Sequence, residues 1–416
     1  MRVLSHLIPL VSLFCTSTHS YPQGDVISPI SADPFDYPSD FSWIQSYAAV
    51  GDSYAAGIGV GTVLGQPDAV QCSRYDGAYP QKMNSVIQAP NFQFIACSGH
   101  TSKDMIMNQI GQLQDNSYDL ITVSAGGNDV GFSDVLKACL FLPTPMSKCT
   151  EALTNAEAFI DTSLERSIYD LLNGLAPKLR PAGFFVQTLY AKFFDETPGT
   201  CDKQSWCFLN PTVDGCLKVD VPMRSEFNRL VGKTNQKLFD TIKRWNSESS
   251  AKNVYAAHWG GWPIALDGQL CEPGSADRYS DPSNAGLAFI RPDVGNVFIP
   301  PERRELELMN ITAQSVDDHS LQKRLPDVIM QYFHPTDWGT NMQAAVGLSA
   351  VSKGRAHMDA ADRNQPHLCS VDPPPGGQDV VAPTPGQGVA APSAGGGNDP
   401  SPTPGGVRVR RGRVGR

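Results

Sequence analysis

The sequence has no hydrophobic run long enough to cross a membrane. An apolar stretch near its start, residues 3–15, is shorter than the roughly 20 residues that a transmembrane helix needs. It follows Arg2 and precedes Thr18-His19-Ser20, an acceptable cleavage site, and this order is typical of a secretory signal. We therefore expect residues 1–20 to be a signal peptide and the protein to be secreted and extracellular, with no transmembrane segment.

Motifs that bind metals or nucleotides are also missing. The chain has no Cys-x-x-Cys pair, no His-Glu-x-x-His, no glycine-rich phosphate loop and no calcium-binding loop. These absences argue against zinc, calcium and nucleotide sites. We expect no metal and no cofactor, and we expect the protein to act as a monomer.

Charged residues are scarce, at 18% of the chain, and the positive ones are unevenly placed. Five arginines fall in the last nine residues, and a sixth, Arg2, lies in the expected signal. Without these six arginines the formal charge of −9 becomes −15. An acidic body of this kind argues against a nucleic-acid partner.

Ten cysteines are present, and Cys15 would leave with the signal. In an oxidising compartment the remaining nine favour disulfides. We expect the pairs Cys72–Cys97 and Cys139–Cys149, and we suggest Cys201–Cys207 and Cys216–Cys271 for a second group. Spacing alone does not fix the pairing, and Cys369 is left over.

The rest of the chain divides into three parts. Residues 21–42 contain four prolines and read as an extended lead-in. Residues 43–371 form the expected globular domain, with apolar strand-like runs alternating with helical patterns, as in α/β proteins. Residues 372–416 are rich in Pro, Gly, Ala and Ser and are expected to be a disordered tail with a basic end. The expected strands are 46–50, 92–96, 120–124, 184–189 and 253–257.

Two apolar stripes at helical spacing are expected to face the core, one from Leu164 to Leu179 and one from Phe227 to Trp245. The segments 190–222 and 259–320 instead read as long insertions that could wall a substrate pocket. They carry aromatic residues suited to an acyl tunnel or to a sugar-binding platform. Asn310 begins an N-glycosylation signal. The aromatic residues are Trp206, Phe208, Trp259, Trp262 and Phe289.

Small polar loops follow the first three expected strands. They contain Gly51-Asp52-Ser53, then Gly99, then Gly126-Gly127-Asn128-Asp129, and His334-Pro335 comes near the end of the domain. Neighbouring parallel strands would bring the three loops to one edge of the sheet. Hydrolysis by a serine needs three things: the serine itself, a histidine base, and hydrogen-bond donors for the oxyanion. Losing one of these donors raises the activation barrier by roughly 3–4 kcal/mol.

These four blocks, in this order, resemble the GDSL or SGNH hydrolase family, in particular its secreted, disulfide-containing members. The resemblance covers roughly residues 44–351. It implies a flavodoxin-like three-layer α/β/α sandwich with a five-stranded parallel sheet. It also implies Ser53 as nucleophile, His334 as general base, and an oxyanion hole formed by the N–H groups of Ser53 and Gly99 and the side chain of Asn128. Because Ser53 lacks a Gly-x-Ser-x-Gly elbow, the α/β-hydrolase fold fits poorly.

One position departs from the family pattern. Many members place an aspartate three residues before the histidine, where this chain has Gln331. A glutamine side chain lacks the charge that stabilises an imidazolium. By resemblance to members that use a Ser–His dyad, we expect the backbone carbonyl of Gln331 to orient His334. Asp327 is the alternative.

The resulting functional hypothesis is a secreted serine esterase or lipase that forms an acyl-serine intermediate. The substrate stays open between lipid or small-molecule esters and acetylated polysaccharide. A protein of another class, a catalytically silent secreted binding protein on the same scaffold, is the remaining alternative. The intact Ser53, Gly99, Asn128 and His334 argue against it.

Overall fold

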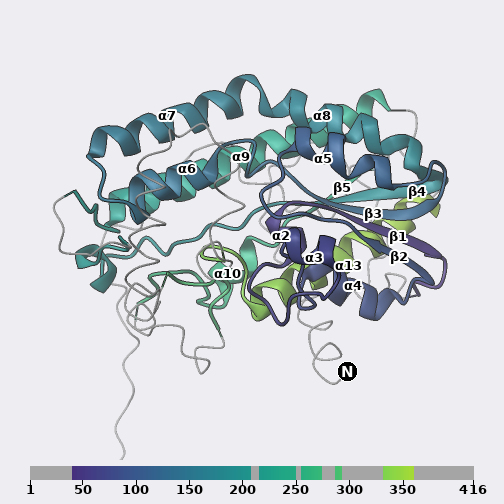
Figure 1. The fold of residues 1–416 in the computed structure, drawn as a ribbon, viewed down its shortest axis with the longest axis horizontal. Helices are drawn as coiled ribbons and strands as arrows, with labels where there is room; N and C mark the ends of the chain where they lie inside the picture. The colour runs from purple at the N-terminus through teal and green to yellow at the C-terminus, as the bar shows by residue number, and fades with distance from the viewer. Residues whose placement is uncertain (1–39, 208–214, 250–253, 274–285, 293–330, 360–416) are drawn as a thin grey trace, which may run out of the picture. The chain divides into compact units, whose positions relative to one another are not determined.

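A five-stranded parallel sheet forms the centre of the molecule (Figure 1). The computed structural model describes residues 40–207, 215–249, 254–273, 286–292 and 331–359. The strand order is β2-β1-β3-β4-β5, and all four pairings are parallel. The strands are β1 (Ser46–Gly51), β2 (Asn91–Phe94), β3 (Tyr118–Ser124), β4 (Leu179–Thr188) and β5 (Val254–Ala257).

Both faces of the sheet are covered, which explains why its strands are nearly continuous in apolar residues. Alternate residues of one strand enter different core clusters: Ala48 and Val50 of β1 pack in one, Tyr47 and Ala49 in the other. The same alternation separates Phe185 from Phe184 in β4. The period-2 geometry of a strand thus supplies side chains to both faces at once.

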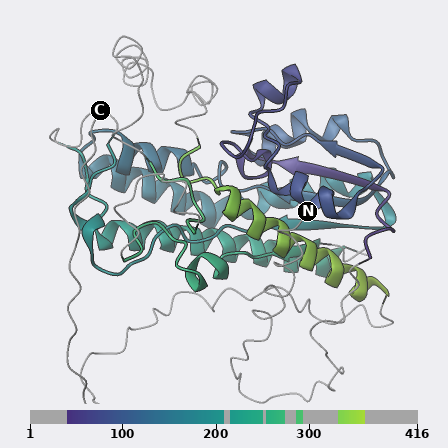
Figure 2. The ribbon, with the colours of Figure 1, turned by 90° about the horizontal axis from the view of Figure 1, so that it is seen from below.

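Helices form the two outer layers (Figures 1 and 2). One face carries α4 (Tyr79–Ile87) and α13 (Asp337–Asp359), which pack on each other, and α13 also packs on β4 and β5. Figure 2 shows α13 as the long yellow-green helix crossing this side. On the other face lie α5 (Ser102–Asn108), α8 (Leu164–Leu175) and α9 (Val221–Glu248), and α7 (Met146–Thr162) packs on α8 and α9. The expected three-layer α/β/α class is confirmed.

The five expected strands are all present, with shifted ends, whereas one expected helix is too long. The stripe that begins at Leu164 was expected to stay helical through Leu179. Helix α8 ends at Leu175, the short 3-10 helix Ala176–Lys178 follows, and Leu179 begins β4. Pro177 explains the difference, because it cannot donate the backbone hydrogen bond that would continue an α-helix. The stripe from Phe227 to Trp245 lies within α9, as expected. No helix within the described ranges is long and apolar enough to span a bilayer.

Four disulfides are formed. Cys72–Cys97 and Cys139–Cys149 are confirmed. The suggested pairing of the second group is wrong: the bonds are Cys201–Cys271 and Cys207–Cys216. The chain after β4 lies against the segment after β5 in a parallel bridge, where Asp195 donates its backbone N–H to the carbonyl of Leu270. This contact brings Cys201 to Cys271, across 70 residues. Asn310, Phe208, Cys369 and the signal and tail segments lie outside the described residues.

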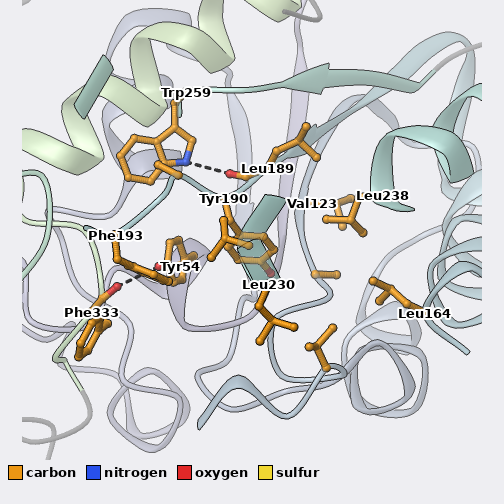
Figure 3. Close-up of a cluster of buried hydrophobic side chains, with 14 of the residues drawn as sticks. Tyr54, Val123, Leu164, Leu189, Tyr190, Phe193, Leu230, Leu238, Trp259 and Phe333 are labelled. Carbon is orange, nitrogen blue, oxygen red and sulfur yellow. Dashed lines mark hydrogen bonds between the residues drawn. The ribbon is translucent and has the colours of Figure 1, made fainter. Parts of the chain in front are cut away.

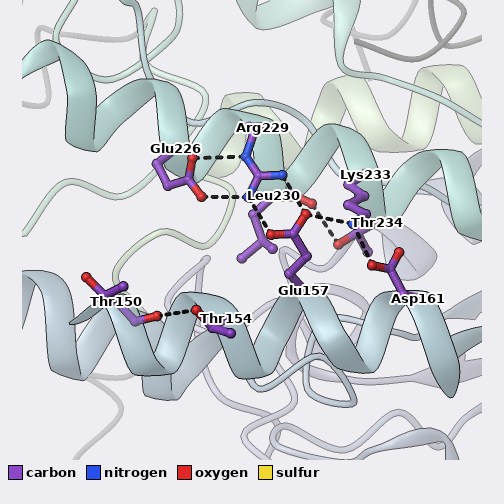
Figure 4. A network of polar contacts seen from close by, with 9 residues as sticks. All are labelled: Thr150, Thr154, Glu157, Asp161, Glu226, Arg229, Leu230, Lys233 and Thr234. Atoms are coloured by element: carbon purple, nitrogen blue, oxygen red, sulfur yellow. Dashed lines mark hydrogen bonds and ion pairs between the residues drawn. The ribbon is translucent and has the colours of Figure 1, made fainter. Parts of the chain in front are cut away.

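A network of charges joins α7 to α9 on the outer layer (Figure 4). Glu157 of α7 accepts hydrogen bonds from Arg229, at 2.8 and 2.9 Å, and from Lys233, at 2.7 Å. Arg229 also pairs with Glu226, and Lys233 with Asp161. The bonds from Arg229 and then Lys233 lower the pKa of Glu157 to about 2. Because the Glu157 side chain is 34% exposed, solvent screens the network and limits its contribution to stability.

We expect Glu157→Gln to lower the free energy of unfolding at neutral pH by about 1 kcal/mol. Folding lowers the pKa of this carboxyl, so its contribution is present above the ordinary glutamate pKa and is lost as the pH falls toward 2. Urea unfolding at pH values spanning this range measures the difference between wild type and variant. The control Glu151→Gln, at a more exposed pair with Lys148, should give a much smaller difference. A Glu157 difference that grows as the pH falls would contradict the assignment.

Candidate active site

The three loops that follow β1, β2 and β3 meet at one edge of the sheet. Strand β1 lies between β2 and β3, and all three run parallel, so their carboxyl ends share an edge. Backbone hydrogen bonds join the end of β1 to both neighbours. Asp52 donates its N–H to the carbonyl of Ser124, the last residue of β3, at 3.0 Å, and Cys97, which follows β2, donates its N–H to the carbonyl of Gly51 at 2.9 Å. The structure therefore brings the Ser53, Gly99 and Asn128 loops together, as expected.

Ser53 is the first residue of the short helix α2 (Ser53–Ala56). Asp52 caps this helix, with its side chain accepting the N–H of Tyr54. Gly51 is required just before it, because a Cβ there would lie 2.8 Å from the carbonyl oxygen of Ser124. The sharp transition from strand to helix directs the Ser53 side chain away from the sheet and toward His334.

The distance between Ser53 Oγ and His334 Nε2 is 2.6 Å. This is a hydrogen bond between residues 281 positions apart in the sequence. An antiparallel bridge holds the histidine loop: Phe333 donates its N–H to Ile290, and Ile290 donates its own to His334. Thr336 caps α13 immediately afterwards, with its hydroxyl accepting the N–H of Gly339. The histidine therefore sits between a bridge and a capped helix.

The group behind the histidine differs from the expectation. Nδ1 of His334 lies 3.1 Å from the carbonyl oxygen of Tyr332. The prediction that the carbonyl of Gln331 orients the ring is therefore wrong by one residue. The Gln331 carbonyl is instead engaged in the turn, where it accepts the backbone N–H of His334 at 3.0 Å. Phe333 takes a φ of +65°, and this left-handed residue lets the chain reverse and turn the Tyr332 carbonyl toward the ring. The alternative, Asp327, lies outside the described residues.

Asn128 and Gly99 lie on loops that are tied to each other. Asn128 donates a side-chain N–H to the carbonyl of His100, at 2.9 Å. Its neighbour Asp129 accepts the backbone N–H and the hydroxyl of Ser102 at the start of α5. An amide nitrogen carries two hydrogens, so Asn128 retains a second donor. Within the described part of the chain, no acceptor is paired with the backbone N–H of Ser53 or of Gly99.

Asp52 is buried behind the serine and accepts three hydrogen bonds. They come from the Ser124 hydroxyl at 2.8 Å, the Tyr54 N–H at 3.0 Å and the Tyr190 hydroxyl at 3.1 Å. Burial raises the pKa of Asp52 to about 6, against the lowering effect of these three donors. None of these three bonds involves His334. Asp52 therefore acts as a hydrogen-bond acceptor that holds the loop of Ser53 in place.

Three supporting residues escaped the sequence interpretation. Gln109 is buried and forms two bonds with Gly51, at 3.0 and 2.9 Å, while its Nε2 also lies 2.9 Å from Nδ1 of His100. Tyr54 donates its hydroxyl to the carbonyl of Phe333, at 2.9 Å (Figure 3). The Tyr190 hydroxyl accepts the N–H of Gly127, at 2.8 Å. Of these three residues, only Tyr54 could have been suspected from the sequence, because it directly follows Ser53.

Within the residues that the structure describes, the aromatic side chains of the insertions are buried and pack against one another near the histidine loop, and they are not exposed to solvent. Trp259 is buried and donates its indole N–H to the carbonyl of Leu189 (Figure 3). The centroid of its ring lies 5.6 Å from that of Phe289. Trp206 and Phe333 are also in contact, with ring centroids 5.8 Å apart. Trp259 therefore packs in the core, and neither the acyl-tunnel nor the sugar-platform interpretation fits its buried ring. Among the described residues no group of acidic, His or Cys side chains is arranged to hold a metal ion.

Comparison with known proteins adds independent information. The GDSL-like lipase/acylhydrolase family matches residues 49–193. Over these residues the chain is similar to this family. The match contains Ser53, Gly99 and Asn128, whereas His334 lies beyond it.

Two curated relatives of this chain come from Streptomyces. Lipase 1 of Streptomyces coelicolor is 30% identical over 150 residues, covering 36% of this chain and 54% of that protein. A lipase of Streptomyces rimosus is 27% identical over 196 residues, covering 45% and 69%. The chain thus spans about half of the first relative and about two thirds of the second. The crystal structure of the extracellular lipase of Streptomyces rimosus has a TM-score of 0.50 at 20% identity, over 74% of this chain and 99% of that one, which supports the fold.

We expect Asp52→Asn to change how stability depends on pH. Because folding raises the pKa of Asp52 to about 6, its contribution favours folding below the ordinary aspartate value of about 3.9 and is lost as the pH rises through about 6. The asparagine variant cannot titrate there. Between about pH 4 and pH 7.5, wild type should therefore lose about 2–3 kcal/mol of unfolding free energy relative to the variant.

Urea unfolding of both proteins at the two pH values measures this difference. The contributions of the ionisable groups that the two proteins share cancel in the comparison. Asp240→Asn, at an exposed position of α9, is the matched control and should follow wild type. If the Asp52 variant also followed wild type, the carboxyl would not be titrating in the predicted range.

Proposed function

We propose that this protein hydrolyses carboxylic esters, with Ser53 as nucleophile and His334 as general base and acid. The observation that carries the proposal is the 2.6 Å separation of Ser53 Oγ and His334 Nε2. A serine within hydrogen-bond reach of an oriented histidine is the arrangement that activates a hydroxyl for acyl transfer. The match of residues 49–193 to a lipase and acylhydrolase family supports the same chemistry.

The reaction proceeds in two balanced halves. Ser53 Oγ attacks the ester carbonyl carbon while His334 Nε2 takes the hydroxyl proton, and the collapsing intermediate expels the alcohol, which receives that proton. Water then attacks the acyl-serine, again giving its proton to His334, and the carboxylic acid leaves as Ser53 recovers its hydrogen. We assign to the Tyr332 carbonyl at Nδ1 the role of keeping the tautomer in which Nε2 accepts, and we propose a Ser–His dyad.

The carbonyl oxygen of the substrate becomes an oxyanion in both halves. We assign its donors to the backbone N–H of Ser53, the backbone N–H of Gly99 and a side-chain N–H of Asn128. The lack of paired acceptors for the two backbone groups among the described residues supports this assignment. So does the tie from Asn128 to the His100 carbonyl, which holds the amide beside the Gly99 loop. Fixed donors of this kind need no reorganisation during the reaction.

We propose that the substrates are lipid esters and that the protein acts outside the cell. The two curated relatives are lipases. Four disulfides favour an oxidising compartment. An acetyl esterase of the same fold is the alternative outcome of the substrate test.

Labelling with a fluorophosphonate tests the nucleophile. The reagent should modify wild type once, on Ser53, and Ser53→Ala should not be labelled. Ser124→Ala, at a serine on the same sheet edge that bonds Asp52 rather than His334, should still be labelled. Mass spectrometry of the digested adduct locates the modified residue. A label that persists in Ser53→Ala would overturn the assignment.

Rates on p-nitrophenyl esters of increasing chain length, measured beside release of acetate from acetylated xylan, test the substrate class. We expect kcat/KM to rise from the acetyl ester to the longer acyl chains, because each buried CH₂ contributes about 0.8 kcal/mol. A steep preference for acetyl esters and acetylated xylan would identify a carbohydrate esterase instead.

A further inference from the structure

Tyr190 connects the loop of the nucleophile to the loop of Asn128. It lies two residues after β4 and is buried. Its hydroxyl donates to Asp52 Oδ2, at 3.1 Å, and accepts the backbone N–H of Gly127, at 2.8 Å. Asp52 caps the helix that begins with Ser53, and Gly127 directly precedes Asn128. One oxygen atom therefore bridges the two loops that the proposed reaction uses.

The position of this hydroxyl is fixed from the opposite side by α9. Asn235, which is buried, accepts the backbone N–H of Tyr190 at 2.9 Å and donates its own amide to the Tyr190 carbonyl at 2.7 Å. The Tyr190 ring also meets that of Tyr54 edge-on, with centroids 5.2 Å apart (Figure 3). A side chain restrained in this way has one accessible place for its hydroxyl.

Gly127 is shaped to this contact. A Cβ at that position would lie 3.1 Å from the Tyr190 hydroxyl oxygen and 3.3 Å from the ring carbon that carries it. The absence of a side chain lets the backbone N–H approach the hydroxyl closely. The contact with Tyr190 thus explains why the second residue of the Gly126-Gly127 pair is a glycine.

We propose that Tyr190 is a positioning residue, which holds the Asn128 loop in register with Ser53 through Asp52 and Gly127. The inference rests on the proposed function and deepens it. Tyr190 bonds neither Ser53 nor His334, so its effect should be on the turnover step rather than on binding. A small displacement of a reacting group or an oxyanion donor can lower a rate by about 100-fold.

The experiment compares Tyr190→Phe with wild type on a p-nitrophenyl ester. We expect kcat to fall by about 10- to 100-fold with KM within about twofold. Tyr47→Phe is the matched control, because it removes an equally buried hydroxyl, bonded to Thr122 at 3.0 Å, from β1 itself. Its kcat should stay within about twofold of wild type. Gly127→Ala disturbs the same contact from the glycine. Combined with Tyr190→Phe, it should lower kcat little further than Tyr190→Phe alone.

Hydrogen exchange supplies a readout that does not depend on activity. The Gly127 amide should exchange faster in Tyr190→Phe than in wild type or Tyr47→Phe, since it loses its acceptor. Unchanged kcat in Tyr190→Phe, an equal loss in Tyr47→Phe, or unchanged exchange at Gly127 would each overturn the inference. A folded wild type without esterase activity would instead refute the proposed function, and the exchange result would still decide whether Tyr190 holds this loop.

Discussion

The hydrogen bond between Ser53 and His334 is the interaction on which the rest of the site depends. Its two residues lie far apart in the sequence, one directly after strand β1 and the other shortly before helix α13. Neither element can place them alone. The parallel sheet fixes the serine at its carboxyl edge, and the bridge between residues 287–291 and the histidine loop fixes His334. The distance of 2.6 Å is thus a product of tertiary structure.

A second layer of polar contacts supports this pair from beneath. Asp52 gathers donors from β3, α2 and the segment after β4, and Tyr54 ties the helix of the nucleophile to the histidine loop. Buried polar groups are costly unless their hydrogen bonds are made. The cost of burying Asp52 is expressed in its raised pKa, and its three donors oppose that rise. The site therefore combines a strained turn at Phe333 with a satisfied network around Asp52.

Much of this arrangement could be predicted from the sequence, because it follows from local rules. Apolar runs ending in small polar loops marked the strands and their edge, and the order of Ser53, Gly99, Asn128 and His334 marked the family. The support could not be predicted in the same way. Tyr190 and Gln109 carry no local signal, since their partners are set by where β4 ends within the sheet and by how α5 packs on β1.

The errors have the same origin. Cys201, Cys207, Cys216 and Cys271 offer several pairings at similar spacing, and only the approach of two insertions selects Cys201–Cys271. The choice between the Gln331 and Tyr332 carbonyls depends on one dihedral angle, the positive φ of Phe333. A sequence pattern that identified the histidine could not reach that level of detail.

A crystal structure of the protein inactivated by an alkyl phosphonate would test the central claim most directly. The phosphorus should be bonded to Ser53 Oγ, with one phosphoryl oxygen within hydrogen-bond distance of the N–H groups of Ser53 and Gly99 and of Asn128 Nδ2. His334 should keep its Nδ1 on the Tyr332 carbonyl. Phosphorus on another residue, or a phosphoryl oxygen that faces away from Gly99 and Asn128, would contradict the account.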